Sequence, residues 1–189
     1  MRAPPAGVRL CLQVVAVLAL VLPVPCATLE RLTLDEMIAK STAIVRGTVT
    51  GSWAAFSGPI IYTHYTIRVT EQYKGGTANS VEVVIPGGTV DGFRQFFSGA
   101  PVLERGAEYV LMLWTGKSGL TQVMGLTQGL FAIQPGGSDP VVTRAATREL
   151  MLDRQTGQAV KDETLTMHLS ALRSRIASGL TLGRGSSAK

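Results

Sequence analysis

Few side chains in this 189-residue chain are candidates for catalysis or metal binding. Its two histidines are the strongest candidates, because imidazole is the commonest metal ligand and general base. His64 lies in an alternating segment and His168 in a segment with apolar periodicity. Neither histidine has a second histidine four residues away or a cysteine pair to join it. We interpret His64 as a partly exposed strand residue, and the alternative is a pair with a carboxylate on a neighbouring strand, for example Glu82.

The other catalytic patterns are incomplete. Residues 116–118, Gly-Lys-Ser, resemble the end of a phosphate-binding loop, but that motif needs a glycine where this chain has Leu111, and a helix afterwards. A hairpin turn between two strands is expected there instead. The Gly-x-Ser-x-Gly elbow of serine hydrolases does not occur, and Asp91, Glu104 and Glu108 lack a motif spacing. The sequence therefore favours a protein that is not an enzyme and needs no cofactor.

A cluster of aromatic residues marks a candidate binding loop. The segment Gly87 to Pro101 has no clean period, and its length indicates either a functional loop or a partly helical one. A protruding contact loop for a partner is predicted from the residues Phe93, Arg94, Phe96 and Phe97. The alternative is that these phenylalanines close the open end of a small barrel.

The first 27 residues read as a secretory signal peptide. Arg2 and Arg9 precede the apolar run Leu10 to Leu22, which is too short to cross a membrane and ends at a proline. We expect cleavage after Ala27, with no stable membrane span afterwards, and a secreted or periplasmic location. The two cysteines, Cys11 and Cys26, lie within this segment, so no disulfide is expected in the mature domain.

Composition excludes several classes of protein. With 46% hydrophobic and 16% charged residues the chain is globular rather than disordered. Without Arg2 and Arg9 its formal charge is about +3, which together with export argues against nucleic-acid binding.

Hydrophobic periodicity predicts the elements that must position these residues. Thr33 and Glu36 form a capping box before a short helix from Leu34 to Lys40. Alternation with β-branched residues predicts strands at 43–53, 60–70, 81–85 and 107–114, and a hairpin from 120–126 and 130–134. Both faces of 107–114 are apolar, so that strand should be central. Gly47 and Gly51 on one face of the first strand suggest bending or a close backbone approach.

The C-terminal part is predicted as an extension of the main domain. Edge strands are expected at 141–143 and 150–152, with a tight turn at 153–157. An amphipathic helix is expected over Asp162 to Ala177, with a stripe of Leu165, Leu169, Leu172 and Ile176. The expected units are the signal peptide at 1–27, a β domain at 28–138, the helical extension at 139–178 and a disordered tail at 179–189.

The order of these segments carries a resemblance. The motifs are IVRGTV at 44–49, YKG at 73–75 and RGAEYVL at 105–111. They resemble a group of exported bacterial proteins of unassigned function and, more distantly, the netrin-like domains of the tissue inhibitors of metalloproteinases. The resemblance implies a mainly β fold, a small OB-like antiparallel barrel with a short N-terminal helix and a C-terminal amphipathic helix. Those inhibitors chelate the protease zinc through an N-terminal cysteine, for which this chain offers only Cys26.

These observations favour an exported, non-catalytic binding module whose partner is another exported protein, recognised through the loop at 87–101. One alternative is an envelope hydrolase or metal-dependent enzyme that uses His64 with strand carboxylates. Others are a metalloprotease inhibitor and a structural envelope protein whose leucine stripe pairs between chains. The sequence leaves the ligand and the oligomeric state open.

Overall fold

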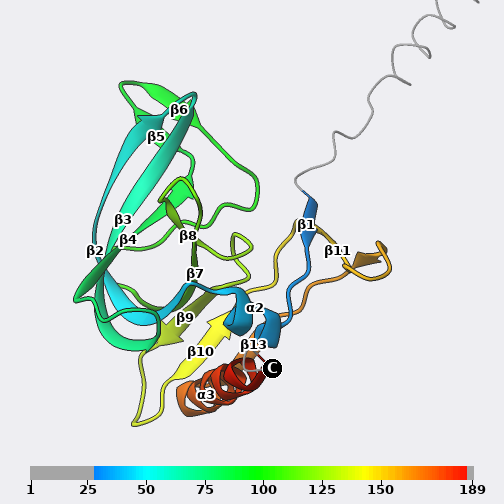
Figure 1. Cartoon of the computed structure of the whole chain (residues 1–189). Helices are drawn as coiled ribbons and strands as arrows, with labels where there is room; N and C mark the ends of the chain where they lie inside the picture. Colours follow the sequence, from blue (N-terminus) through cyan, green and yellow to red (C-terminus); the bar gives the residue numbers. More distant parts are fainter. Residues whose placement is uncertain (1–27, 187–189) are drawn as a thin grey trace, which may run out of the picture.

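The computed structural model describes residues 28–186, and the proposed signal peptide with Cys26 and Ala27 lies outside the described residues. The fold is mainly β with two helices, as the sequence predicts (Figure 1). Neither helix of the described part is long and apolar enough to cross a membrane.

The elements follow one another in the order β1, α2, β2 to β13 and α3. The helices are α2, Leu34–Lys40, and α3, Leu169–Ser186. The strands are β1 Thr28–Glu30, β2 Ala43–Ser57, β3 Ile60–Lys74, β4 Ser80–Pro86, β5 Gly88–Val90, β6 Phe93–Gln95, β7 Glu108–Thr115, β8 Thr121–Val123, β9 Leu130–Gln134, β10 Val141–Arg144, β11 Leu150–Leu152, β12 Ala159–Val160 and β13 Leu165–His168.

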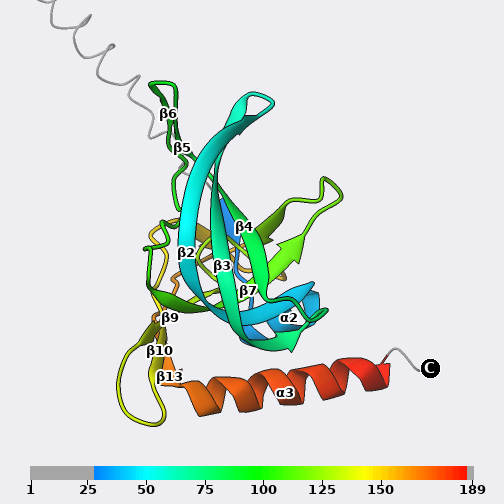
Figure 2. The same cartoon turned by 90° about the vertical axis from the view of Figure 1, so that its left-hand side faces the viewer.

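Eight strands form one antiparallel sheet. Its order is β13-β10-β9-β7-β2-β3-β4, and β8 pairs with the end of β7 beyond β9. The two longest strands, β2 and β3, form a hairpin that extends well beyond its neighbours (Figure 2). Within the described residues this sheet does not close into a barrel, since β4 at its edge lies beside β8 without pairing with it.

Two small sheets complete the fold. One has the order β1-β11-β12, in which β1 pairs parallel to β11 and thereby joins the N-terminal segment to the C-terminal region. The other is the hairpin of β5 and β6, which lies beside the far end of β2 and β3 (Figure 1).

The main sheet is buried on both faces. Alternate residues of β2 and β7 enter different cores: Ile44 and Val110 pack beneath the two helices, whereas Val45 and Leu111 pack on the opposite face. The strand β7 has five consecutive buried residues, Tyr109 to Leu113, and lies between β2 and β9. This confirms the prediction of a central strand covered on both sides.

Capping chemistry defines the first helix as expected. The side chain of Thr33 accepts a hydrogen bond from the backbone N–H of Glu36, and the Glu36 carboxylate accepts one from the backbone N–H of Thr33. Because the carboxylate accepts hydrogen bonds from the backbone and the hydroxyl of Thr33, the pKa of Glu36 is lowered. Met37 and Ile38 of this helix are fully buried.

The C-terminal helix begins later and ends later than predicted. Residues 165–168 form β13, which pairs with β10, so the helix over 162–177 was wrong at its start. Helix α3 continues to Ser186, which contradicts a disordered tail over 179–186. The part of the stripe that is helical, Leu169, Leu172 and Ile176, is buried in this chain's own core.

Two further predictions were wrong because strand pairing depends on contacts distant in sequence. Strands β8 and β9 both pair with β7 and do not form a hairpin with each other. Strand β10 lies between β9 and β13, and β11 lies between β1 and β12, so neither is an edge strand. Of the two alternatives for the segment Gly87 to Pro101, the partly helical one is wrong, because the segment contains a β-hairpin and no helix.

The two glycines of β2 differ sharply in their surroundings. A Cβ at Gly47 would lie 2.5 Å from the carbonyl oxygen of Arg68 and 2.6 Å from Ile67, whereas a Cβ at Gly51 would meet nothing within 4 Å. The prediction of a close backbone approach therefore holds at Gly47 and fails at Gly51. Register shifts accompany both positions, between Arg46 and Gly47 and between Val49 and Gly51.

We expect Gly47→Ala to lower the free energy of unfolding by about 2–4 kcal/mol, because the new methyl group must displace backbone of β3. The matched variant Gly51→Ala should change it by less than about 1 kcal/mol, since alanine has space and restricts the unfolded chain. Urea denaturation followed by circular dichroism measures both. If the two variants lost the same amount of unfolding free energy, the close contact at Gly47 would not explain the effect of the substitution there.

Candidate functional site

The candidate site is an aromatic surface at the end of the β2–β3 hairpin, which we call the tip surface and define as Phe56, Phe93, Arg94 and Phe96. Phe93 and Phe96 are 68% and 81% exposed, and Phe56 is 48% exposed. The rings of Phe56 and Phe93 meet edge to face, with centroids 6.4 Å apart. Phe56 of β2 and Phe93 of β6 are therefore in contact on the surface, and Phe96, just after β6, is the third exposed aromatic side chain of this end of the molecule.

Hydrogen bonds fix the β5–β6 hairpin to the longer hairpin beneath it. The Gln95 side chain accepts from the backbone N–H of Ile61 at 2.7 Å and donates to the carbonyl of Pro59 at 2.8 Å. On the other strand, the backbone N–H of Gly87 donates to the carbonyl of Ile61, and the Thr63 hydroxyl donates to the carbonyl of Gly87. The tip surface is thus presented on an anchored element.

The turn of the small hairpin has a local sequence signal that hydrophobic periodicity does not include. Asp91 and Gly92 join β5 to β6 with φ values of 48° and 83°, the left-handed geometry of a tight two-residue hairpin turn. An Asp-Gly pair is among the strongest local indications of such a turn. Because the segment lacks hydrophobic alternation, the dipeptide alone could have revealed it.

Phe93 and Phe96 do not close the end of a barrel, since both are exposed. Phe97 is only partly exposed and differs from them: with Arg94 and Phe96 it lines a cavity of about 350 Å³ beneath the tip surface. The opposite wall of that cavity comes from Thr63 and Ile85 of the main sheet. Of the four residues predicted for a binding loop, Phe93, Arg94 and Phe96 are exposed and Phe97 is partly buried, and all except Phe93 line this cavity.

The alternative site at His64 is a pair of side chains on neighbouring strands. Nδ1 of His64 lies 3.0 Å from Oε1 of Glu82, as the sequence allowed. The imidazole also stacks on the indole of Trp53, with centroids 3.8 Å apart and an angle of 11° between the rings. One face of the imidazole is thus covered by Trp53.

The remaining chemical candidates are not assembled into a site within residues 28–186. No three His, Cys, Asp or Glu side chains of this range gather closely enough to hold a metal ion. His168 lies near Asp139, with its Nδ1 3.2 Å from the Asp139 carbonyl oxygen. The Gly-Lys-Ser tripeptide lies in the turn between β7 and β8, where the backbone N–H of Gly119 donates to the carbonyl of Gly116.

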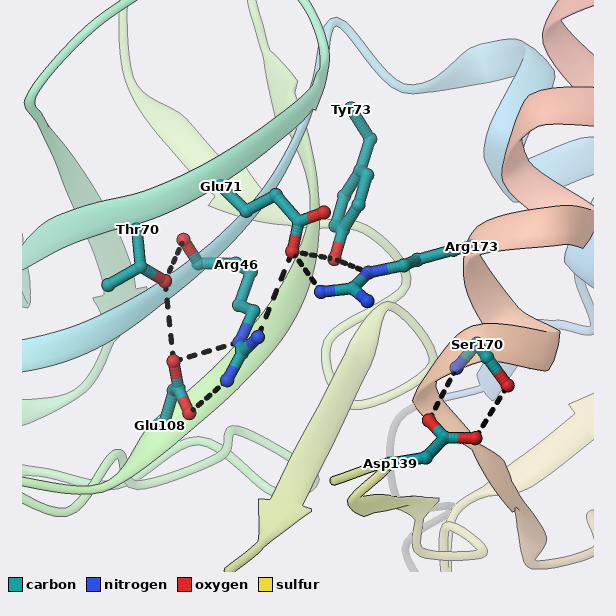
Figure 3. Close-up of polar contacts among 8 residues, drawn as sticks. All are labelled: Arg46, Thr70, Glu71, Tyr73, Glu108, Asp139, Ser170 and Arg173. Carbon is teal, nitrogen blue, oxygen red and sulfur yellow. Dashed lines mark hydrogen bonds and ion pairs between the residues drawn. The ribbon is translucent and has the colours of Figure 1, made fainter. Parts of the chain in front are cut away.

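The structure also contains a charged network that sequence reasoning missed. Arg46 on β2 donates two hydrogen bonds of 2.9 Å to the carboxylate of Glu108 on β7 (Figure 3). Arg173 on α3 donates to Glu71 on β3, and Glu71 also accepts from the hydroxyl of Tyr73 at 2.9 Å. These five residues are scattered in sequence, so only the folded chain brings them together.

The network shifts the ionisation of its members. Burial is the main reason that the pKa of Tyr73 rises to about 12, and its hydrogen bond to Glu71 adds to that rise. Hydrogen bonds to Tyr73 and Glu71 raise the pKa of Arg173, and the hydrogen bond to Glu108 raises that of Arg46. Each arginine therefore already has a carboxylate partner, so we interpret the network as structural.

A second polar contact fixes the start of α3. The Asp139 carboxylate accepts hydrogen bonds from the backbone N–H and the hydroxyl of Ser170, at 3.0 and 2.6 Å (Figure 3). These contacts lower the pKa of Asp139. The carboxylate thus satisfies a donor of the first helical turn in the manner of a cap, although it is distant in sequence.

Comparison with known proteins adds no assignment, because no protein-family model and no curated protein matches the chain.

The raised pKa of Tyr73 predicts a stability change in alkali. An unfolded tyrosine loses its proton near pH 10, whereas folded Tyr73 retains it to about pH 12, so the folded state binds more protons between these values. We expect the free energy of unfolding to fall as pH rises from 10 to 12, and this fall to be shallower in Tyr73→Phe. Urea denaturation across this range measures the slope.

Absorbance titration of the phenolate band identifies the group responsible. The chain has four tyrosines. Tyr73→Phe should remove a component that titrates near pH 12, whereas Tyr62→Phe, the matched control, should leave that component unchanged. A component near pH 12 that persists in Tyr73→Phe would contradict the assignment.

Proposed function

We propose that this protein is an exported, non-catalytic binding module that recognises another exported protein through the tip surface. The single observation that carries the proposal is the pair Phe93 and Phe96, which expose 68% and 81% of their surface on an element held by hydrogen bonds. A large exposed aromatic patch is unfavourable in water unless a partner covers it. Aromatic residues and arginine also dominate the binding energy of protein interfaces.

Export is part of the same proposal. It is supported by the charged and apolar pattern of residues 1–27 and by the location of both cysteines within that segment. Arg94 is exposed and lies between Phe93 and Phe96 in the sequence, so the partner surface we expect is apolar at its centre and acidic at its rim.

We also propose that the main sheet is an open barrel of the OB-like or netrin-like type. Its support is the curved antiparallel sheet with one extended hairpin, together with the position of β4 alongside β8 (Figure 2). A cavity of about 70 Å³ lies between these two strands, lined by Val84 and Val123 among others. The strands approach each other as the edges of a nearly closed barrel would.

Site-specific photocrosslinking tests the binding proposal. A photoreactive phenylalanine analogue at Phe96 should form an adduct with one exported protein, whereas the same analogue at Leu182 should not. Leu182 is the matched control because it is 78% exposed and lies on α3, at the opposite end of the molecule (Figure 2). Phe93→Ala in the Phe96-labelled protein should raise the partner concentration needed for half-maximal adduct about thirtyfold, since an aromatic residue that is an interface hot spot contributes about 2 kcal/mol or more.

Two results would contradict the proposal. One is an equal set of adducts from positions 96 and 182, and the other is no adduct at position 96 in the compartment where the protein accumulates. Circular dichroism of each labelled protein verifies that the fold is intact.

A second candidate function rests on the contact between His64 and Glu82. An envelope hydrolase or metal-dependent enzyme would use this pair as a base or ligand set. His64→Ala separates the two functions: it should leave the crosslink at Phe96 unchanged if the protein is a binding module. Loss of a bound metal or of a hydrolytic activity in His64→Ala would instead support the enzyme.

A further inference from the structure

A separate cavity lies between the end of α2 and the connection from β8 to β9. Its volume is about 530 Å³, within the range of small-molecule sites. The lining is mostly apolar and includes Leu32, Trp114, Val123, Met124 and Leu126. Lys40 and Gln122 are its polar members. We call this cavity the Trp114 pocket, and it shares no residue with the tip surface.

A buried glutamine holds two walls of the Trp114 pocket together. Gln128 is 1% exposed, and its side chain accepts from the backbone N–H of Leu32 at 2.8 Å and donates to the carbonyl of Glu30 at 2.9 Å. Its own backbone N–H donates to the carbonyl of Gly125 at 3.1 Å. The segment that carries Leu32 and the turn at 124–128 are thus linked through one side chain, so the pocket is preformed.

The turn itself adopts an unusual backbone conformation. Leu126 has a φ of +59°, a left-handed value that costs a non-glycine residue about 1–3 kcal/mol. Such conformations concentrate at ligand-binding and other functional positions. Here the strained residue lines the Trp114 pocket, next to Gly125, which also has a positive φ of 59°.

Trp114 contributes a flat wall in a defined orientation. The indole lies over Gly116, where a Cβ would approach its ring to 2.8 Å, and the residue remains 47% exposed. A glycine beneath the ring and a free aromatic surface above the pocket suit the stacking of a planar ligand.

The charged residue in the wall of the Trp114 pocket indicates which class of ligand the pocket can bind. Among the described residues that line the pocket, Lys40 alone is charged. Its Nζ lies 3.9 Å from carboxylates of Glu30 and Glu36, and all three side chains are at least one-third exposed, so these ion pairs are weak. A ligand anion can therefore compete for the ammonium group.

We infer that the Trp114 pocket binds a small organic anion with a planar apolar body. The apolar part would stack on Trp114 and contact Leu32, Met124 and Leu126, and the carboxylate or sulfonate would pair with Lys40. This inference concerns a surface distinct from the tip surface and does not depend on the proposed function.

A fluorescent probe pair tests both halves of the inference. The anionic probe is 8-anilinonaphthalene-1-sulfonate, and N-phenyl-1-naphthylamine is its uncharged analogue without the sulfonate. The chain has two tryptophans, so a Trp53→Phe background leaves Trp114 as the single emitter. Under native conditions we expect the anionic probe to quench Trp114 saturably at one site, and to bind more tightly than the uncharged probe.

Variants assign the two contacts. Lys40→Met should weaken binding of the anionic probe about tenfold and leave binding of the uncharged probe unchanged. Lys117→Met, in the exposed turn between β7 and β8, should change the affinity for neither probe. Gly116→Ala, which tilts the indole, should weaken both probes. Urea denaturation of each variant verifies that it is folded before titration.

Three results would overturn the inference. They are binding that does not saturate, equal losses of affinity in Lys40→Met and Lys117→Met, and unchanged affinity for both probes in folded Gly116→Ala and Trp114→Ala proteins, the latter followed by the fluorescence of the probe itself.

Discussion

The constraint on which this structure depends is the burial of one sheet on both faces. Strand β7 contributes Val110 and Met112 to the core beneath the helices and Leu111 and Leu113 to the core on the other side. A sheet of this kind is stable only if a layer covers each face. Residues 28–186 contain no cysteine, so apolar packing and backbone pairing must supply the stability of this part of the chain.

The C-terminal helix covers one face because polar contacts orient it at two points. The Asp139 carboxylate accepts hydrogen bonds from the backbone N–H and the hydroxyl of Ser170 at the start of α3. One turn later, Arg173 pairs with Glu71 on β3. Arg173 and Glu71 are partly exposed, so the pair contributes orientation more than stability. The buried side chains Leu169, Leu172 and Ile176 provide the hydrophobic stabilisation.

With both faces of the sheet covered, its exposed features lie at the two ends. The tip surface lies on the hairpin at one end, where the Gln95 side chain forms hydrogen bonds with the backbone of the β2–β3 hairpin. The Trp114 pocket lies near α2, where the Gln128 side chain forms hydrogen bonds with the backbone of the N-terminal segment. In both places a glutamine side chain satisfies backbone groups of a segment outside the main ladder, which keeps an irregular surface ordered.

The sequence by itself determined the local features. The capping box of Thr33 and Glu36, the strand at β7 with its two apolar faces, and the clustering of Phe93, Arg94 and Phe96 were all readable, because each depends on neighbours within a few residues. Tertiary structure decided the rest. Residues 165–168 continue a helical pattern but pair with β10, since filling the edge of a sheet outweighs a weak local preference. The network of Arg46, Glu71 and Arg173 and the walls of the Trp114 pocket join segments far apart in sequence, and no local period records such contacts.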